Sequence, residues 1–515
     1  MKSFLLTLAF AFSVALASAD QPNIIIILAD DQGFGDVSAL NPGSKIPTPH
    51  IDRIAKEGMI FSDAHTSSSV CTPTRYSLLT GRYHWRTHLQ KGVLGGFSPP
   101  LIAPDRLTIA GLLKDKGYYT ACVGKWHLGF DWQMKDGSIA DDEGDFSGGF
   151  KGGWEVDYKA PIQNGPVDVG FDTFFGISAS LDMPPYVYIQ DRVATQEATV
   201  EKAFHRPGPA GADFEAVDVL PDITAKTVAI IQERAAAAKE GNPFFIYFPL
   251  NAPHTPIVPP EEWIGKSGVN IYADFTMQVD HCVGQVLAAL DEGGIAENTL
   301  IIFTTDNGCS PQANFAELEA AGHKASYIYR GHKADIYEGG HRVPFVARWP
   351  KVVTAGSQSN ALISQIDLLA TAAEITGVEV PETQGEDSVS FLSLLKDATA
   401  EPTRDAVITQ SINGSFAVRD GNWKLALCPG SGGWSEPRPG RSDLSGLPPV
   451  QLFDLASDPG EQTNLAEKHP DRVKKMTAAL QSMIDQGRTT PGPKLENDVP
   501  VEMIKPVPAP GKKKA

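Results

Sequence analysis

One cysteine stands at the head of a polar segment whose residue types could carry covalent chemistry. Cys71 begins the run Cys-Thr-Pro-Thr-Arg, which ends at Arg75 and continues as Ser-Leu-Leu-Thr-Gly-Arg over residues 77–82. No second cysteine lies near it at Cys-x-x-Cys spacing, so the segment predicts neither a disulfide framework nor a metal cluster. The surrounding Ser, Thr and Pro residues are typical of a loop. These residues alone leave open a reactive or a buried free thiol.

Acidic side chains follow two apolar runs, at residues 23–28 and 299–305, that have the composition of buried strands. The residues after these runs are Asp30, Asp31, Asp306 and Asn307. Adjacent carboxylates repel each other unless a proton or a cation lies between them. Carboxylate and amide oxygens suit a hard cation such as calcium, which takes about six to eight of them. No histidine is clustered with these residues, which argues against zinc. The alternative is a solvated acidic turn.

The elements that would position these side chains alternate between strands and helices. Apolar, β-branched runs predict strands at 23–28, 243–250 and 299–305. Helical patterns between and around them cover 51–57, 108–116, 223–239 and 272–292. This alternation predicts an α/β fold with a large, mixed but mostly parallel sheet between helical layers. Ligands in such sheets bind at the carboxyl ends of the strands, where both acidic segments lie.

The chain is long enough for about two domains, because it has 515 residues. Residues 130–221 are rich in Gly, Asp and Pro and predict a loop-rich insertion, a common location of specificity. Short strand patterns around Asp420-Gly421 and an amphipathic pattern at 470–486 predict a small α+β domain built on an antiparallel sheet. The expected divisions are a signal peptide at 1–19, a main domain at 20–385, a C-terminal α+β subdomain at 386–490 and a disordered tail at 491–515.

The N-terminus and the net charge limit where the protein acts and what it binds. A basic start, an apolar run at 4–16 and the sequence Ala17-Ser18-Ala19 predict a signal peptide, and hence a periplasmic or secreted protein. No later apolar run is long enough to predict a membrane span. The formal charge of −18 argues against nucleic acid as a partner. An anionic substrate would therefore need positive charge supplied locally by the site.

Several segments together resemble a known family. The run from Cys71 to Arg75 resembles the C-x-P-S/T-R signature of type I sulfatases, members of the alkaline-phosphatase-like superfamily. The other matching segments are Gly-Lys-Trp-His-Leu-Gly at 124–129, Ala-Pro-His-Thr-Pro at 252–256, Arg-Gly-His-Lys at 330–333 with Glu-Gly-Gly at 338–340, and segments at 419–424 and 454–461. The resemblance covers nearly the whole chain after the signal peptide, and it implies an alkaline-phosphatase-like fold with residues 20–385 as the catalytic domain.

The resemblance implies an arylsulfatase-like sulfuric ester hydrolase. In that family a maturation enzyme converts the cysteine to formylglycine (3-oxoalanine), and Cys71 takes this position. Asp30, Asp31, Asp306 and Asn307 are then expected to hold calcium together with the modified residue. One hydroxyl of the hydrated aldehyde attacks sulfur, and the other loses a proton to expel sulfate.

The remaining family roles map onto basic residues. Arg75 and Lys125 are expected to support the hydrated aldehyde, and His127 to take the proton that triggers sulfate release. Lys333 and His254 are expected to contact the sulfate and the bridging oxygen, with His254 as general acid for the leaving alcohol. Lys324 lies in a similar His-Lys dipeptide, but only Lys333 matches the family segment.

Other activities and the substrate stay open from sequence. A phosphatase or phosphodiesterase of the same superfamily would use Ser or Thr and a second, histidine-rich metal site. An unmodified Cys71 would leave a non-catalytic glycan-binding protein. Export and the long insertion favour a sulfated carbohydrate, with aryl sulfates as model substrates. Candidate contacts to the sugar are His84, Arg86 and His88, with Asp182, Asp191 and Arg192 as weaker ones; the alternative is a surface loop without a ligand.

Overall fold

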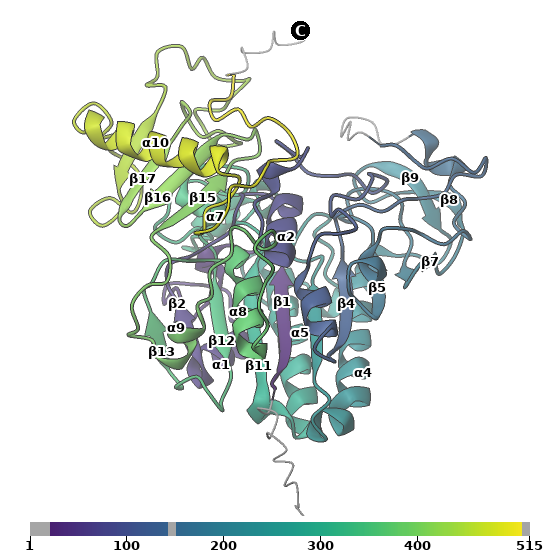
Figure 1. Ribbon diagram of the computed structural model, residues 1–515. Coiled ribbons are helices and arrows are strands. Elements are labelled where there is room, and N and C mark those ends of the chain that lie inside the picture. Colours follow the sequence, from purple (N-terminus) through teal and green to yellow (C-terminus); the bar gives the residue numbers. More distant parts are fainter. Residues whose placement is uncertain (1–20, 143–150, 507–515) are drawn as a thin grey trace, which may run out of the picture.

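The central strand of the protein is the apolar run that begins at Asn23. The computed structural model describes residues 21–142 and 151–506, so the expected signal peptide and the end of the expected tail lie outside the described residues. A ten-stranded sheet has the order β13-β2-β12-β11-β1-β10-β4-β5-β6-β7. Its middle strands β11, β1, β10, β4 and β5 are all mutually parallel. Antiparallel pairs follow on both sides, through β12 and β2 and through β6 and β7, while the edge strand β13 pairs with β2 in parallel. This confirms the expected large, mixed and mostly parallel sheet (Figure 1).

The elements have the following bounds. The strands of the large sheet are β1 (Asn23–Ala29), β2 (Met59–Phe61), β4 (Tyr119–Lys125), β5 (Thr173–Ile177), β6 (Ile189–Gln190), β7 (Val193–Ala194), β10 (Phe244–Pro249), β11 (Thr299–Thr305), β12 (Phe345–Arg348) and β13 (Ser357–Ser359). The other strands are β3 (Ala64–His65), β8 (Ala198–Ala203), β9 (Pro207–Gly211), β14 (Ile363–Ser364), β15 (Ala406–Gln410), β16 (Phe416–Asp420), β17 (Trp423–Ala426) and β18 (Gln451–Asp454). The helices are α1 (Pro49–Glu57), α2 (Cys71–Thr80), α3 (Ile109–Lys114), α4 (Val219–Lys239), α5 (Ile271–Gly293), α6 (Phe315–Ala320), α7 (Glu338–His341), α8 (Leu368–Thr376), α9 (Leu392–Lys396) and α10 (Pro470–Asp485).

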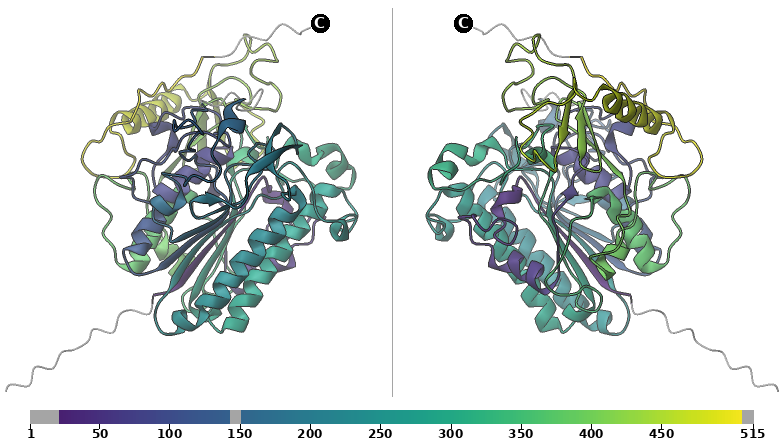
Figure 2. Two further views of the ribbon diagram at one scale, coloured as in Figure 1. Left: turned by 90° about the vertical axis from the view of Figure 1, so that its right-hand side faces the viewer. Right: turned by 90° about the vertical axis from the view of Figure 1, so that its left-hand side faces the viewer.

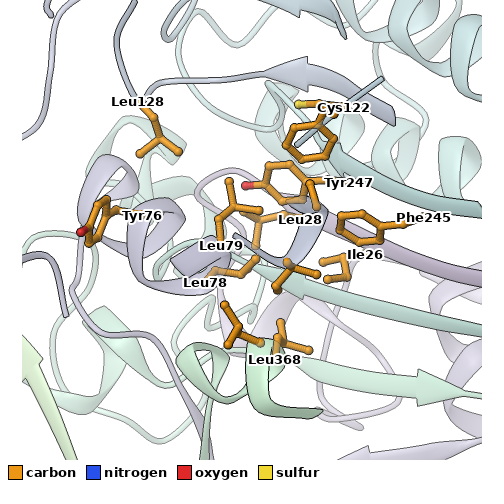
Figure 3. Packing of buried hydrophobic residues seen from close by; sticks show 14 of the residues in the cluster. Ile26, Leu28, Tyr76, Leu78, Leu79, Cys122, Leu128, Phe245, Tyr247 and Leu368 are labelled. Carbon is orange, nitrogen blue, oxygen red and sulfur yellow. The ribbon is translucent and has the colours of Figure 1, made fainter. Parts of the chain in front are cut away.

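Helices cover both faces of the large sheet, which explains why β1 is apolar at successive positions. Ile25 and Ile27 pack in the core under α1, α4 and α5. Ile26 and Leu28 point to the other face, toward α2, α3 and α8. Figure 2 shows the two helical layers, and Figure 3 shows Ile26 and Leu28 in the second core. None of the helices described is long and apolar enough to cross a membrane.

The C-terminal part forms the expected antiparallel sheet. Strands β15, β16, β17 and β18 pair in that order, and β16 joins β17 through the Asp420-Gly421 turn that the sequence predicted. Gly421 has φ of 55°, a conformation that favours glycine in tight hairpin turns. Helix α10 packs Met476, Leu480 and Ile484 against this sheet. Strand β15 was not predicted.

Three sequence expectations differ from the structure. Cys71 lies not in a loop but in the first turn of α2, whose residues are all buried. Helix α9, placed in the C-terminal subdomain by the boundary at 385, packs in the core of the large sheet instead. Residues 491–506, expected to be disordered, are described and run along the surface, where Asn497 and Asp498 bind arginines. Residues 507–515 lie outside the described residues.

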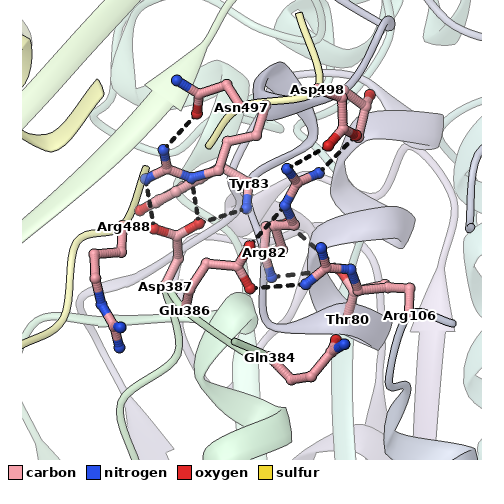
Figure 4. A network of polar contacts seen from close by, with 12 residues as sticks. Thr80, Arg82, Tyr83, Arg106, Gln384, Glu386, Asp387, Arg488, Asn497 and Asp498 are labelled. Carbon is pink, nitrogen blue, oxygen red and sulfur yellow. Dashed lines mark hydrogen bonds and ion pairs between the residues drawn. The ribbon is translucent and has the colours of Figure 1, made fainter. Parts of the chain in front are cut away.

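A buried network of charges joins the end of α2 to the segment that leads into the C-terminal part. Arg86 forms a bidentate pair with Asp387, with both N–O distances 2.8 Å, and both residues are fully buried. Arg82 binds Glu386 at 2.7 Å and also reaches Asp498 (Figure 4). If the two segments moved apart, each buried carboxylate would lose its arginine while remaining desolvated, which is unfavourable. These pairs therefore fix the position of the two segments relative to each other.

Replacing Arg86 with Met should destabilise the protein by about 3–5 kcal/mol, because Asp387 would stay buried without its main partner. The matched control is Arg192→Met, which breaks the partly exposed pair with Asp168 and should cost at most about 1 kcal/mol. Urea unfolding followed by circular dichroism measures both. Similar losses for the two variants would contradict the importance of burial at Arg86.

Candidate active site

The candidate site lies at the carboxyl ends of four neighbouring parallel strands. Asp30 and Asp31 follow β1, and Asp306 and Asn307 follow β11, its partner in the sheet. The amide of Asn307 donates to Asp31 Oδ1 at 2.8 Å, and the backbone N–H of Asp31 donates to Asp306 Oδ1 at 3.3 Å. On the other side of β1, His254 follows β10, while Lys125 ends β4 and His127 comes just after it. The parallel register thus brings together residues that lie far apart in the chain.

The oxygens at these strand ends suit a hard cation. The four residues at these strand ends are at most 1% exposed: Asp30, Asp31, Asp306 and Asn307. Asp30 Oδ1 and Asn307 Oδ1 are buried and have no hydrogen-bond partner among the residues that the structure describes. Burial and the charge of Asp30 raise the pKa of Asp306 to about 7, against the opposite effect of Arg75. Unpartnered oxygens and crowded carboxylates are what a calcium ion would satisfy.

Three cations from different segments surround these carboxylates. Lys125 donates to Asp30 at 2.6 Å, Lys333 lies 2.6 Å from Asp31, and Arg75 binds Asp306 at 2.8 Å. Burial favours the neutral amine of Lys333, but Asp31 and the other nearby acids outweigh it and raise its pKa. Lys324 is exposed, so Lys333 is the lysine placed in the site, as the sequence predicted. These three cations balance the three carboxylates, so a cation bound at this cluster would provide the positive charge that an anionic substrate needs.

Cys71 lies beside this charged cluster. Its side chain is 3% exposed, at the N-terminal end of α2, and Lys125, Lys333, Asp306 and Asp30 all act on it electrostatically. Burial is the main cause of a raised pKa for the Cys71 thiol, and the two lysines only partly oppose it. Because the thiolate is the reactive form of cysteine, this environment makes an unmodified Cys71 a poor nucleophile.

His127 is held as a neutral base. Its Nε2 lies 2.8 Å from the carbonyl oxygen of Leu94, which can only accept, so Nε2 carries the proton. Nδ1 is buried and lacks a hydrogen-bond partner among the described residues, which leaves its lone pair available. Burial, Lys125 and Arg75 hold the pKa of His127 well below its ordinary value. The backbone of His127 has φ of 57°, a strained conformation that is often found at functional sites.

His254 has a complementary arrangement. Its Nδ1 donates to the carbonyl oxygen of Thr255 at 2.6 Å, and its Nε2 lies 3.7 Å from Asp31 Oδ2. Because Nδ1 is bound to a carbonyl, His254 can donate a proton from Nε2 only as the imidazolium. His254 thus lies with Asp30 and Asp31 in one cluster, so the expectation that no histidine accompanies these aspartates was wrong. The sequence could not show this cluster, because more than 200 residues separate His254 from the aspartates.

A cavity of about 960 Å³ opens onto Cys71, Lys333 and His254. This volume is at the upper end of the roughly 300–1,000 Å³ typical of small-molecule sites. His88 and Asp182, two of the residues that the sequence predicted to contact the substrate, also line it. The same cavity is lined by Ser180, Arg206 and Trp434. The sequence did not predict these residues, because nothing in their local patterns distinguishes them from ordinary loop residues.

Four proposed substrate contacts are not at this cavity. His84 is 1% exposed and binds Gln410 at 2.7 Å, while Arg86 is held by Asp387, so neither side chain can reach a ligand without breaking buried contacts. Asp191 accepts a hydrogen bond from Thr173, and Arg192 pairs with Asp168. Their roles are structural, and the expectation from the sequence was wrong for these residues.

A second buried cluster of histidines and acids lies behind the Lys333 loop. His65, Glu338 and His341 have ligand atoms close enough for a metal ion. However, the ammonium of Lys424 donates to His341 at 2.9 Å and to Glu338 at 3.1 Å, and it lies 2.8 Å from Glu461. A cation already occupies this position, so the cluster is a structural ion network. It ties β17 to α7, which follows Lys333 in the chain.

Comparisons with known proteins agree with this geometry. The family model described as Sulfatase matches residues 22–378, and the model described as N-sulphoglucosamine sulphohydrolase, C-terminal, matches residues 331–426. The chain is 32% identical to an N-acetylgalactosamine-6-O-sulfatase of Bacteroides thetaiotaomicron, over 90% of this chain and 94% of that protein. It is 31% identical to human arylsulfatase A, over 89% of this chain and 86% of that protein.

A solved structure shows the same fold. It comes from work on glycosaminoglycan metabolism by Bacteroides thetaiotaomicron, and it matches with a TM-score of 0.75 at 30% identity, over 90% of this chain and 99% of that chain.

The Lys424 network generates a stability prediction with a defined pH dependence. Burial and Glu338 raise the pKa of Glu461 to about 7, and Lys424 opposes them. In a Lys424→Met variant Glu461 would lose its cation, while Glu338 would keep Arg342 and Arg419 nearby, at a cost of about 3–5 kcal/mol when Glu461 is ionised. A raised carboxyl pKa in the folded state means that stability is retained at low pH and lost as pH rises. The loss in Tm should therefore be larger at pH 8 than at pH 5.5.

The control is Lys135→Met, which removes an exposed lysine and should change Tm little at either pH. A loss in Tm for Lys424→Met that is the same at both pH values would show that the buried acids do not govern it.

Proposed function

This chain belongs to the sulfatase family, and from that premise we propose that it removes sulfate from a sulfated carbohydrate, using formylglycine made from Cys71 and a bound calcium ion. The observation that carries the proposal is one cavity in which Cys71, Lys333 and His254 meet beside a buried cluster of oxygens. A sulfatase hydrolyses sulfate esters, so this cavity must neutralise the sulfate and supply a proton to the leaving oxygen.

The cofactors proposed here fit the residues present. Asp30, Asp31, Asp306 and Asn307, with the modified residue 71, would hold calcium, and two of their oxygens lack a partner. Bound calcium would supply positive charge that polarises the sulfate, and the hydrated aldehyde of formylglycine would supply a hydroxyl nucleophile and a second hydroxyl for release. The raised pKa of the Cys71 thiol supports the need for conversion, because the unmodified residue is mostly protonated.

The roles of the basic residues follow from their hydrogen bonds. Lys125 and Arg75 are buried beside residue 71, where their charge favours a deprotonated oxygen. His127 is neutral and offers Nδ1, so it can accept the proton whose removal triggers sulfate release. His254 is oriented to donate from Nε2 toward the leaving oxygen. Lys333 lies at the cavity surface and would neutralise the sulfate oxygens.

The alternative of a phosphatase with a second metal site is not favoured. Among the described residues, the other cluster of histidines and acids is His65, Glu338 and His341, and Lys424 already provides its cation. The names of the relatives make N-acetylgalactosamine 6-sulfate the first carbohydrate to test. An oligosaccharide or a different sulfated sugar would be a refinement of the same proposal.

Mass spectrometry of the peptide that contains Cys71, from protein produced with a maturation enzyme, tests the first step. Conversion to the aldehyde is expected. An unmodified thiol in fully active protein would refute the proposed nucleophile.

A Cys71→Ser variant should lose nearly all sulfatase turnover, because serine has no second hydroxyl with which to expel sulfate. A sulfated protein should then accumulate, visible as a stable mass increase on the peptide that carries the substitution. The matched control is Cys282→Ser, a buried cysteine in α5 away from the cavity, which should keep its turnover. Wild-type turnover in Cys71→Ser would exclude the aldehyde mechanism.

Calcium binding should weaken as pH falls below about 7. Asp306 is the reason, because its raised pKa leaves it protonated in acid, and it must lose that proton to bind the ion. One such proton lowers affinity by up to about tenfold per pH unit. Calorimetric titration of chelator-treated protein at pH 8, 7 and 6 measures this, and calcium should restore activity better than zinc.

In an Asp306→Asn variant calcium should bind more weakly than in the wild type, and its affinity should vary less with pH. Equal calcium affinity from pH 8 to pH 6 in the wild type would contradict a protonated Asp306 in the metal-free protein.

A further inference from the structure

Two walls of the cavity have no part in the proposed sulfate chemistry. One wall comes from the insertion and contains Ser180, Asp182 and Arg206. The other contains Ile412 and Trp434, from the C-terminal part. Figure 1 shows that the insertion strands β7–β9 and the C-terminal sheet lie on opposite sides of the large sheet's upper end. The cavity is therefore bounded on two sides by segments that are separate from the strand ends of the sulfate site.

The insertion wall presents hydrogen-bonding groups that the described residues leave unsatisfied. Asp182 Oδ2 pairs with Arg206 at 2.6 Å, but Asp182 Oδ1 and the hydroxyl of Ser180 are buried without a partner. Asp182 is only 8% exposed, so an unsatisfied oxygen there carries a desolvation cost. Burial favours the neutral acid, but His254 and Arg206 outweigh it and lower the pKa of Asp182. The wall thus holds a carboxylate whose charge Arg206 balances and whose second oxygen is an unused acceptor.

The opposite wall is aromatic and firmly placed. The backbone N–H groups of Trp434 and Ser435 both donate to Asp335 Oδ1, at 2.7 and 3.0 Å. Asp335 is fully buried and lies two residues after Lys333, the lysine proposed to neutralise sulfate. The position of Trp434 is therefore coupled to that of the sulfate site. An aromatic side chain beside polar groups is suited to the apolar face of a sugar ring.

We propose that these two walls form a sugar subsite, with Trp434 contacting the ring and with Asp182 and Ser180 binding its hydroxyl groups. This inference rests on the proposed function, because it assigns the sugar that carries the sulfate. Arg206 already pairs with Asp182, so the wall does not offer a free cation for a second anionic group. The subsite selects a sugar with hydroxyl groups, rather than another sulfate or a carboxylate, facing Asp182.

The test compares kcat/KM for N-acetylgalactosamine 6-sulfate and for 4-nitrophenyl sulfate, which lacks the sugar ring. Asp182→Asn keeps the size of the side chain but removes its charge, and Trp434→Ala removes the aromatic surface. Each should lower kcat/KM on the sugar by about tenfold or more, because hydrogen bonds to charged groups and aromatic contacts contribute on this scale. On the aryl sulfate each of the two variants should change kcat/KM by less than about threefold.

Two matched controls come from the same chain. Asp168→Asn changes an aspartate that also pairs with an arginine of the insertion but does not line the cavity, and it should affect neither substrate. Trp434→Phe keeps an aromatic ring and should recover most of the activity on the sugar. A Tm near that of the wild type shows that each variant is folded.

The outcomes separate this inference from the proposed function. No hydrolysis of either substrate by the matured wild type would contradict the proposed function itself. Activity on the aryl sulfate with equal losses on both substrates for Asp182→Asn and Trp434→Ala would overturn the subsite and assign both residues to positioning the catalytic groups.

A third substrate, the 4,6-disulfate of the same sugar, tests the charge preference. The wild type should hydrolyse it less efficiently than the 6-sulfate, and Asp182→Asn should narrow the difference. A wild-type preference for the disulfate would overturn the assignment of hydroxyl groups to this wall.

Discussion

The close approach of three buried carboxylates is the constraint on which the site depends. Asp30, Asp31 and Asp306 are nearly inaccessible to solvent, and their mutual repulsion would be unfavourable without nearby positive charge. The protein supplies that charge as Arg75, Lys125 and Lys333, from a helix, a strand end and a loop. These contacts bring α2, the centre of the large sheet and the loop before α7 together at one place. The same ion pairs thus set the electrostatics of the site and hold these parts of the fold together.

The C-terminal sheet is part of this arrangement rather than an appendage. Gln410, at the end of β15, accepts from the backbone of Ser69, just before Cys71, while Lys424 binds Glu338 behind the Lys333 loop. The segments that carry Cys71 and Lys333 are therefore both attached to the same small sheet. Trp434 extends this connection to the proposed sugar subsite. Loss of the sheet should disturb both the proposed nucleophile and the lysine proposed to bind sulfate.

Burial separates the charged residues that support the fold from those that face the ligand. His84 and Arg86 follow α2 and carry hydrogen-bonding groups that could bind a sugar. Both side chains are nevertheless buried and bound to protein partners. Asp182 and Arg206 also form an ion pair, but they do so at the cavity surface with one oxygen unused. The composition of a segment cannot distinguish these two situations, because the partners lie in other parts of the chain.

The amino-acid sequence determined the fold class and the central strands, and it predicted most of the residues that are proposed for catalysis. Hydrophobic periodicity is local, so it located β1, β10, β11 and the helices α4 and α5. Parallel strands align their carboxyl ends, so the convergence of Asp30 and Asp306 was also predictable. Only the tertiary structure decided which side chains line the cavity, because that depends on contacts across hundreds of residues. The pairing of Lys424 with Glu338, the enclosure of Arg86 by Asp387 and the exposure of Trp434 to the cavity all have this origin.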